Sequence, residues 1–288
     1  MFASYSPALV DYIHLIDEFP VRGGHAVVKQ TYKMPGGAGA NVAHNLANLG
    51  VDSVIFTALG KDDDAEFFIA NTKARVVASR TDEYTGKVDV FVDRDGERTF
   101  FVYPNAAGKP YIDVEPADYL YLDPFPSGDS FELQLKAAKN CPGFVILNPG
   151  FPYTSIGFEK LSPMLRYVDM IIMSEHEFER LNVDLSDVLK FVDYVIITKG
   201  EGGSSCYTKD SEFHAKAVKT KVVDTTGAGD AFAAGFIYCF MKDLPLKVCL
   251  EVGNFCGAYN VSRVGARNFP NAHQIEKFLA SILRSRSK

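Results

Sequence analysis

Two glycine-rich segments, with the polar residues beside them, are the parts of the sequence best suited to chemistry. In the later one, Gly227, Ala228 and Gly229 precede Asp230, and the apolar run that follows predicts a helix over Gly229–Met241. The first N–H groups of a helix have no intrahelical partner, and the helix dipole favours an anion beside them. The three small residues can therefore cradle a phosphate, or a charge that develops on one. Alternatively, Asp230 only stabilises the helix start, by about 0.3–1 kcal/mol.

The earlier segment runs from Pro35 to Asn41 and enters a predicted helix over Asn41–Leu49. Glycines such as Gly36 and Gly37 let a ligand approach backbone amides closely, and Asn41 offers a carbonyl and an amide to hydroxyl groups. The glycines could equally serve tight packing of the loop on the helix. A dinucleotide-binding fingerprint fits poorly, because it would follow the first strand directly and this run comes well after it.

The scaffold that positions these segments is predicted to be a doubly wound α/β fold. Continuous apolar runs bounded by Gly, Pro, Asn or Asp are typical of strands buried on both faces of a mostly parallel sheet. The predicted strands are Ala8–Ile16, Ser53–Leu59, Tyr119–Leu122, Phe144–Leu147, Met170–Met173 and Tyr194–Thr198. The predicted helices besides the two above are Asp62–Thr72, Ser130–Lys139, Glu175–Leu181, Pro245–Arg263 and Ala272–Arg284.

One segment interrupts this alternation and predicts a small β-sheet lid. Lys87–Asp93 alternates apolar and polar residues, turns through a glycine and continues as Arg98–Tyr103, which is typical of an antiparallel hairpin. A hairpin does not easily join a central parallel sheet, so we expect it to project together with Val21–Met34. Residues 1–288 then form a single α/β domain, with a lid made of about residues 17–34 and 84–104.

The predicted lid has two candidate uses. Its apolar and aromatic residues could stack on a sugar or a base, or they could form the lid core or contacts between two chains. These residues are Val28, Tyr32, Phe91, Phe101 and Tyr103. The lid also carries an edge strand, and pairing of two lids would cover it. We therefore expect a homodimer through the lid.

Composition narrows the classes of partner. Thirty basic and 36 acidic side chains give a formal net charge of −6 without a basic run, which argues against binding to nucleic acid or an anionic membrane. A small polar substrate fits better. The first residues have no charged or long apolar stretch, and no window reaches the ~18 apolar residues of a membrane span, so we expect a cytoplasmic protein.

The cysteines and histidines do not predict a metal centre. The five cysteines are odd in number and lie at no CxxC spacing, so we expect reduced thiols in the core. The six histidines show no ligand spacing, and His176, between two glutamates, is expected at the surface. No zinc site is therefore expected.

Taken together, the two glycine segments resemble the N-terminal glycine signature and the C-terminal DTxGAGD signature of the ribokinase-like carbohydrate kinases, also called the phosphofructokinase B family. The second match is the more specific, since every defining position of Asp224–Asp230 agrees. The resemblance covers the chain from Ala8 to about Pro270. It includes the Asn-Pro turn at 148–149, the nucleotide segment at 197–203 and a late helix and loop at 254 and 265–266.

The resemblance implies transfer of the γ-phosphoryl group of ATP to a hydroxymethyl group. Asp230 would be the catalytic base, and Gly227, Ala228 and Gly229 would supply an anion hole for the charge that develops. Asp11 matches the family's sugar-hydroxyl-binding aspartate, and together with Gly36, Gly37 and Asn41 it would fix the acceptor. Without that role, a charge inside a strand is awkward to bury, unless Asp11 lies at an exposed strand end.

The resemblance also implies a nucleotide and ion site. Thr198, Gly200, Gly203 and Asn254 would bind the nucleotide. Glu177 would contact Mg²⁺ through water, although Ser174 stands where the family has asparagine. Asp224 and Thr226 match a site where some members bind a monovalent cation such as K⁺, but they could instead only organise the turn by local hydrogen bonds.

The acceptor itself is not readable from the sequence. Ribose, fructose, a keto-deoxy-sugar acid and a nucleoside are all candidates. The expected activity is therefore an ATP-dependent carbohydrate kinase. A nucleoside kinase and a catalytically idle sugar or nucleotide sensor on the same fold are the alternatives, and the intact Asp230 with its glycine hole argues against the sensor.

Overall fold

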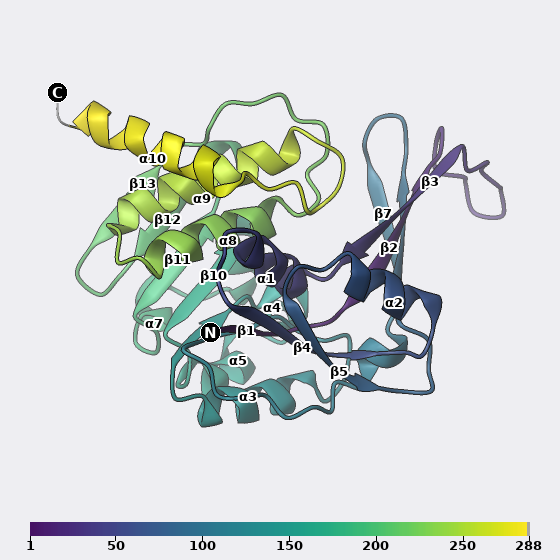
Figure 1. The fold of residues 1–288 in the computed structure, drawn as a ribbon, viewed down its shortest axis with the longest axis horizontal. Helices are drawn as coiled ribbons and strands as arrows, with labels where there is room; N and C mark the ends of the chain where they lie inside the picture. Colours follow the sequence, from purple (N-terminus) through teal and green to yellow (C-terminus); the bar gives the residue numbers. More distant parts are fainter. Residues whose placement is uncertain (287–288) are drawn as a thin grey trace.

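A large, mostly parallel sheet forms the centre of the computed structural model, which describes residues 1–286 (Figure 1). Its strand order is β13-β12-β11-β10-β9-β8-β1-β4-β5. The strands are β1 (Phe2–Tyr5), β4 (Ser53–Leu59), β5 (Arg75–Arg80), β8 (Tyr119–Leu122), β9 (Phe144–Leu147), β10 (Met170–Ser174), β11 (Tyr194–Thr198), β12 (Ser204–Tyr207) and β13 (Glu212–Ala215). Neighbours from β11 to β5 pair in parallel, while β12 and β13 add an antiparallel edge.

Helices cover both faces of this sheet because successive side chains of a strand point to opposite faces. Along β4, Ile55 joins one hydrophobic cluster, and Val54 and Phe56 join the other. The first cluster takes residues from α1 (Ala38–Asn48), α2 (Asp63–Ala70), α8 (Ala228–Phe240), α9 (Leu246–Val261) and α10 (Ala272–Arg286). The second takes them from α3 (Ser130–Asn140), α4 (Gly150–Ser155), α5 (Phe158–Leu165), α6 (Glu175–Leu181) and α7 (Leu185–Val188).

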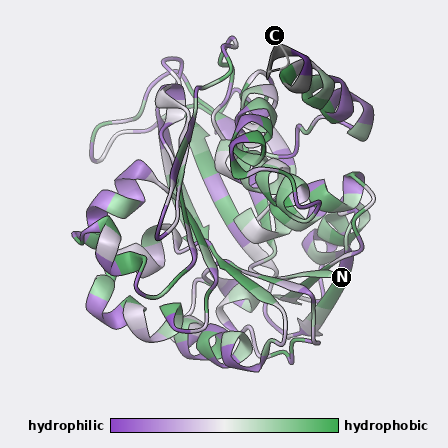
Figure 2. Cartoon of the chain, turned by 90° about the vertical axis from the view of Figure 1, so that its left-hand side faces the viewer, coloured by the Kyte–Doolittle hydropathy of each residue, from purple (hydrophilic) through white to green (hydrophobic). Residues whose placement is uncertain are grey.

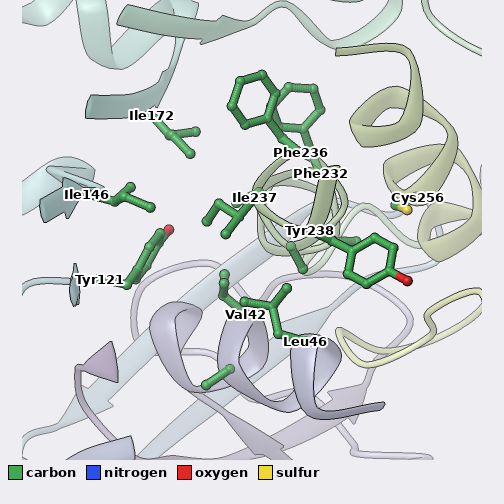
Figure 3. Close-up of a cluster of buried hydrophobic side chains, with 14 of the residues drawn as sticks. Val42, Leu46, Tyr121, Ile146, Ile172, Phe232, Phe236, Ile237, Tyr238 and Cys256 are labelled. Carbon is green, nitrogen blue, oxygen red and sulfur yellow. The ribbon is translucent and has the colours of Figure 1, made fainter. Parts of the chain in front are cut away.

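The contact of α1 with α8 is the part of the core that positions the glycine segments. In Figure 3, Val42 and Leu46 of α1 lie beside Ile237 and Tyr238 of α8, with Ile146 of the sheet nearby. These buried residues pack α1 against α8 on one face of the central sheet. This packing holds the N-terminal ends of the two helices close to each other. In Figure 2 the covering helices carry hydrophilic and hydrophobic residues together, as expected for elements with one buried side.

A second sheet projects from the body in the order β3-β2-β6-β7 (Figure 1). It consists of β2 (Leu9–Leu15), β3 (Gln30–Gly36), β6 (Gly86–Val92) and β7 (Arg98–Tyr103). We call it the lid sheet. The β6–β7 hairpin confirms the predicted antiparallel pair, and β2 pairs with β6 in parallel and with β3 antiparallel.

The placement of the first predicted strand was wrong. Ala8–Ile16 was expected in the central sheet, but β2 belongs to the lid sheet, and the central position is taken by β1. The four residues of β1 are all buried and are followed by Pro7, so their run is too short to stand out by periodicity. The edge strands β5, β12 and β13 were also not foreseen, because they are short or half-buried.

The structure also describes the cysteines, the apolar helices and the candidate metal ligands of the chain. All five cysteines are free, and four of them are buried. Within residues 1–286, no helix is long and apolar enough to cross a membrane. In the same residues no group of three or more His, Cys, Asp or Glu side chains is arranged to hold a metal ion. The His176 side chain lies at the surface, as expected, and its exposed fraction is 92%.

Candidate active site

Asp230 lies in the first turn of α8, at an open helix start. Gly227 caps the helix in the left-handed region, at φ 73°, and a Cβ added to it would come within 2.6 Å of Ala266. This conformation and this close approach require glycine. Gly229 is exposed and has open space around it, so a ligand can reach the first-turn N–H groups from this side.

Asp11 reaches the same region from β2 of the lid sheet. A Cβ on Gly36 would collide with the Asp11 carboxylate, so the missing side chain makes room for that carboxylate against the backbone. Gly37 caps α1 at φ 95°, and a Cβ there would collide with the Pro7 carbonyl oxygen. Both glycines therefore have a local steric reason, and the one at Gly36 serves Asp11 directly.

Asn41 connects α1 with α8. Its Nδ2 donates a hydrogen bond of 2.8 Å to Oδ2 of Asp230, across a sequence separation of 189 residues. Its Oδ1 accepts a hydrogen bond of 2.8 Å from Nε of Arg267. The two glycine segments predicted from the sequence are thus brought into direct contact. Arg267, which sequence reasoning missed, is the third member of this chain of hydrogen bonds.

Burial and neighbouring charges shift the pKa values of these groups. Burial raises the pKa of Asp230 to about 6, although the Asn41 hydrogen bond and the Arg267 charge lower it. Burial likewise raises the pKa of Asp11 to about 7, with Arg267 lowering it and Asp230 raising it. The mutual effects of Asp11, Asp230 and Arg267 place the three charges in one electrostatic cluster.

Asp123, just after β8, is a further buried carboxylate that sequence reasoning missed. Its Oδ2 accepts a hydrogen bond of 2.9 Å from the Gly39 N–H at the start of α1. Burial raises the pKa of Asp123 to about 7, and Asp230 and Glu177 raise it further. Its signal in the sequence was an acidic residue directly after an apolar strand run, at the end where the ligands of α/β sheets bind.

Glu177 and Ser174 form a capping box at the start of α6. The Ser174 N–H and hydroxyl donate to Oε2 of Glu177 at 2.7 and 2.8 Å, and the Glu177 N–H donates to the Ser174 hydroxyl at 3.3 Å. Serine is a preferred N-cap residue, so its presence here has a local physical reason. Both of these contacts to the Glu177 carboxylate are made to Oε2, so Oε1 takes no part in the capping box.

The loop before α8 is tied to the lid sheet by Arg98, another residue that the sequence did not single out. Nη1 of Arg98 donates to the Thr226 hydroxyl at 2.7 Å and lies 3.6 Å from Oδ1 of Asp224, and Nη2 donates to the Thr225 hydroxyl at 2.5 Å. Asp224 also accepts hydrogen bonds from the N–H groups of Thr226 and Gly265. The carboxylate and hydroxyl considered for a monovalent cation thus have protein donors beside them.

The residues expected to bind the nucleotide lie around the β11–β12 connection and α9. Thr198 ends β11, and Gly200 and Gly203 have φ values of 52° and 88° in the turn that follows. Asn254 of α9 is buried, and its Nδ2 donates to the carbonyl oxygens of Ala215 and Lys216 at 3.1 and 3.0 Å. Asn254 therefore anchors the end of β13 to α9, and its side-chain amide is engaged in that contact.

The lid sheet has an inner and an outer face, and the aromatic residues named from the sequence divide between them. Ile13, Val88 and Val90 form a small hydrophobic cluster with Tyr32 and Met34 packed against it. By register, Asp11 and Arg98 lie on this same face, which we call the inner face because both reach the α8 start.

Phe91, Phe101 and Tyr103 lie on the opposite, outer face by the same register. There Phe91 stacks on His14 at 4.8 Å and meets Phe101 edge-on at 5.7 Å between ring centroids. Half of Phe101 is exposed, at 52%. Of the five lid residues proposed to stack on an acceptor, these three point away from Asp230, and Val28 lies exposed in the loop before β3.

Comparison with known proteins agrees with this architecture. Residues 2–273 match the pfkB family of carbohydrate kinases. A nucleoside kinase of Methanocaldococcus jannaschii is 32% identical over 276 residues, covering 91% of this chain and 90% of that protein. An ATP-dependent ribose-1-phosphate kinase of Halopiger xanaduensis is 28% identical and covers 92% and 93%.

Solved structures give the same picture. The nucleoside kinase of M. jannaschii, described as an archaeal member of the ribokinase family, superposes with a TM-score of 0.87 at 28% identity, covering 98% of this chain and 99% of that one. A ribokinase of Thermotoga maritima also reaches a TM-score of 0.87, at 26% identity and with 97% and 99% covered. With glycine segments, helix starts and lid sheet in the arrangement described above, the chain belongs to the pfkB family of carbohydrate kinases and is a kinase with the ribokinase fold.

Proposed function

We propose that this kinase transfers the γ-phosphoryl group of ATP to the hydroxymethyl group of a nucleoside, with Asp230 as the general base. The observation that carries the proposal is the joining of Asp230, Asn41 and Asp11 at the open start of α8, beneath the inner face of the lid sheet. Hydroxyl groups of a ribose moiety suit the oxygens of Asp11 and the amide of Asn41. The base of the nucleoside would lie against the apolar inner face.

In the proposed reaction, the hydroxymethyl oxygen attacks the γ-phosphorus. A new P–O bond forms, the bond from the γ-phosphorus to the bridging oxygen breaks, and ADP leaves with that electron pair. Asp230 accepts the hydroxyl proton, and the first-turn N–H groups at 227–229 stabilise the negative charge on the transferred group. A pKa of about 6 keeps Asp230 mostly ionised near neutral pH while leaving it basic enough to take a proton.

The ATP side is proposed on the matched residues Thr198, Gly200 and Gly203, with Asn254 holding the wall behind them. Mg²⁺ prefers oxygen ligands and keeps several waters, which suits contact through water with the Glu177 carboxylate. Bound with ATP, the ion would neutralise phosphate charge. A monovalent cation beside Asp224 and Thr226 remains part of the proposal, and replacing K⁺ by a bulky organic cation in the assay tests it.

A nucleoside fits the inner face better than a free sugar does. Ile13, Val88 and Val90 form a buried apolar cluster beneath that face, and Phe100 and Val102, which share it by register, are each 52% exposed and give it an apolar surface. Such a surface can stack on a base, whereas a sugar would leave it uncovered. The similarity to a nucleoside kinase supports the same choice.

A sugar or sugar-phosphate acceptor is the second candidate. The similarity to ribokinase and to a ribose-1-phosphate kinase favours it. Both candidates share the role of Asp230 and differ only in what covers the inner face of the lid sheet.

A panel of acceptors separates them. Turnover with ATP and Mg²⁺ is measured on adenosine, inosine, cytidine, ribose, ribose 1-phosphate, fructose and a keto-deoxy-sugar acid. We expect kcat/KM to be highest for a nucleoside and at least tenfold lower for ribose. If turnover is highest on a free sugar, the proposal of a nucleoside acceptor is contradicted, but the proposal of kinase activity with Asp230 as the base is not. Tight binding of ligands without turnover on any of them would identify a sensor.

The outer face of the lid sheet supports the proposal of a homodimer. Phe91, Phe101 and Tyr103 gather there, and the exposed fractions of Phe101 and Tyr103 are 52% and 43%. Contact with a second lid would bury this surface. Light scattering across micromolar concentrations tests it, with Phe101→Glu expected to favour the monomer. A monomeric mass of the unaltered protein throughout that range contradicts the proposal.

A further inference from the structure

Arg267 is a charged side chain that the proposed mechanism has not used, and it is held firmly at the site. Besides the bond from Nε to Asn41, its Nη1 donates to the Asn71 carbonyl oxygen at 2.8 Å and to the Thr72 hydroxyl at 3.0 Å. The guanidinium lies 5.4 Å from the centre of the Phe68 ring. Three hydrogen bonds and an aromatic contact therefore fix its position at the end of α2.

The contact with Arg267 determines which way the Asn41 amide faces. A guanidinium has donors and no acceptor, so the group that meets Nε must be the amide oxygen. The amide nitrogen then faces Asp230, where it can donate to the carboxylate. With the amide reversed, its NH₂ group would meet the guanidinium and its oxygen would meet the carboxylate, and both contacts would be repulsive.

We propose that Arg267 is the positioning residue of the general base: through Asn41 it fixes the Asp230 carboxylate, so that Oδ2 is held by the amide and Oδ1 is left for the proton of the acceptor. This inference rests on the proposed function, in which Asp230 is the base. In this role Arg267 does not touch the substrate. It acts on the reaction only through Asn41.

The burial of Arg267 is difficult to explain by stability alone. Its Nη2 is buried without a hydrogen-bond partner among residues 1–286, and an unpaired buried donor destabilises a fold. Burial also lowers the pKa of Arg267 to about 10, a value at which the side chain is still a cation at neutral pH. A charge retained under these conditions is more readily explained by a role at the site.

The charges around Asp230 indicate what the loss of Arg267 would do. The groups that influence Asp230 or share its cluster come from the lid sheet, the end of β8, α1, α6 and the loop before α10. They are Asp11, Asp123, Asn41, Glu177 and Arg267. Arg267 supplies the positive charge in this set. Glu177 opposes ionisation of Asp230, and Asp230 in turn raises the pKa values of Asp11 and Asp123. Without Arg267 the pKa of Asp230 should rise, because its charge and the amide it orients both stabilise the carboxylate.

The test is the pH profile of Arg267→Met, measured with the best acceptor of the panel. Since the base must be ionised, a higher pKa moves the acid limb of kcat/KM to higher pH. We expect a shift of about one pH unit, so that activity relative to the unaltered enzyme falls roughly fivefold near pH 6, approaches a tenfold loss below about pH 5 and recovers above pH 8. Arg267→Lys, which keeps a cation and a donor, should restore most of the profile.

Arg75→Gln is the matched control, because Arg75 is a surface residue paired with Glu115 away from the site. Its profile should equal that of the unaltered enzyme. A double-mutant cycle with Asn41→Ala tests whether Arg267 acts through the amide. We expect the two losses to be much less than multiplicative, whereas independent, multiplicative losses would contradict transmission through Asn41.

A lower stability of Arg267→Met with an unchanged acid limb overturns the inference. If that variant does not fold, Arg267→Gln replaces it, since glutamine keeps a donor for Asn41 but removes the charge, and its acid limb must still move upward. Failure of the proposed function is separately visible. Asp230→Asn would then retain turnover, whereas an inactive Asp230→Asn with unshifted Arg267 variants overturns only the role of Arg267.

Discussion

The two sheets of this kinase differ in how their faces are used. In the central sheet, β1, β4 and most of β8 to β11 are buried, with helices on both sides. The lid sheet has an inner face turned toward Asp230 and an outer face with half-exposed aromatic rings. Its links to the body include Arg98 with the α8 loop and Lys33 with Asp64 of α2. We therefore expect the central sheet to act as a scaffold and the lid sheet to act as a surface that adapts to a ligand.

The largest difference between the two sheets should be seen in stability. Phe236 of α8 is fully buried in the core of the body, whereas Phe101 of β7 is half exposed. Phe236→Ala should lower the free energy of unfolding by about 3–5 kcal/mol, because it leaves a cavity in a packed core. Phe101→Ala should lower it by less than about 1 kcal/mol. Denaturant unfolding measures both, and equal losses would contradict the division into scaffold and adaptable surface.

The buried carboxyl group of Asp123, in the candidate site between the two sheets, should make the folded protein less stable as the pH rises. The pKa of Asp123 is about 7 in the folded protein and 3.8 as the ordinary value. The folded state therefore holds more protons than the unfolded state between about pH 4 and 7, and its stability falls as the pH rises through that window.

Asp123→Asn keeps an acceptor for the Gly39 N–H and removes this titration. Relative to the unaltered protein, it should gain on the order of 1–3 kcal/mol in unfolding free energy between pH 5 and pH 8. Melting curves at the two pH values measure the gain. If the difference in unfolding free energy between Asp123→Asn and the unaltered protein is the same at both pH values, the pKa of Asp123 is not raised by folding.

A smaller effect is expected at the link between lid sheet and α8 loop. Arg98→Gln removes the charge that contacts Asp224 and weakens two hydrogen bonds to threonine hydroxyls. We expect amide protection of the hairpin over residues 87–103 to fall by about five- to thirtyfold in hydrogen exchange, corresponding to about 1–2 kcal/mol. Binding of an acceptor should restore part of it.

Arg94→Gln is the control for this experiment, because Arg94 is exposed at the hairpin turn. Its exchange should match that of the unaltered protein. If Arg98→Gln also matches, or if a saturating acceptor leaves the hairpin unchanged in every variant, the lid sheet does not respond to the site in the way proposed here.

The fold was largely predictable where burial produces a strong pattern. The parallel strands β4, β8, β9, β10 and β11 and the helices that follow the glycine segments were foreseen from continuous apolar runs and capping residues. The assignment failed at β1 and β2, because a buried four-residue strand gives almost no period and the longer run beside it was taken for the central strand. Which sheet a strand joins is decided by long-range pairing that local sequence does not encode.

The site was predictable where backbone geometry constrains the residue type. Gly36, Gly37 and Gly227 are constrained by collisions that any side chain would cause, and the motif around them led to Asp230 and Asn41. Arg267 and Arg98 could not be found this way, since each is a single arginine whose partners lie far away in sequence. The division of the lid aromatics between two faces follows from the period of two, once the register is known.

The most direct test of the account is one variant, Asp230→Asn, compared with the unaltered enzyme. Asparagine keeps the size of the side chain and suits a helix start, but it cannot take the acceptor proton. We predict that kcat falls ~10²–10⁴-fold while the affinity for ATP is kept. The melting temperature should be unchanged or higher, because a buried carboxylate has been removed. Near-normal turnover of Asp230→Asn would contradict the central claim that Asp230 is the base of this kinase.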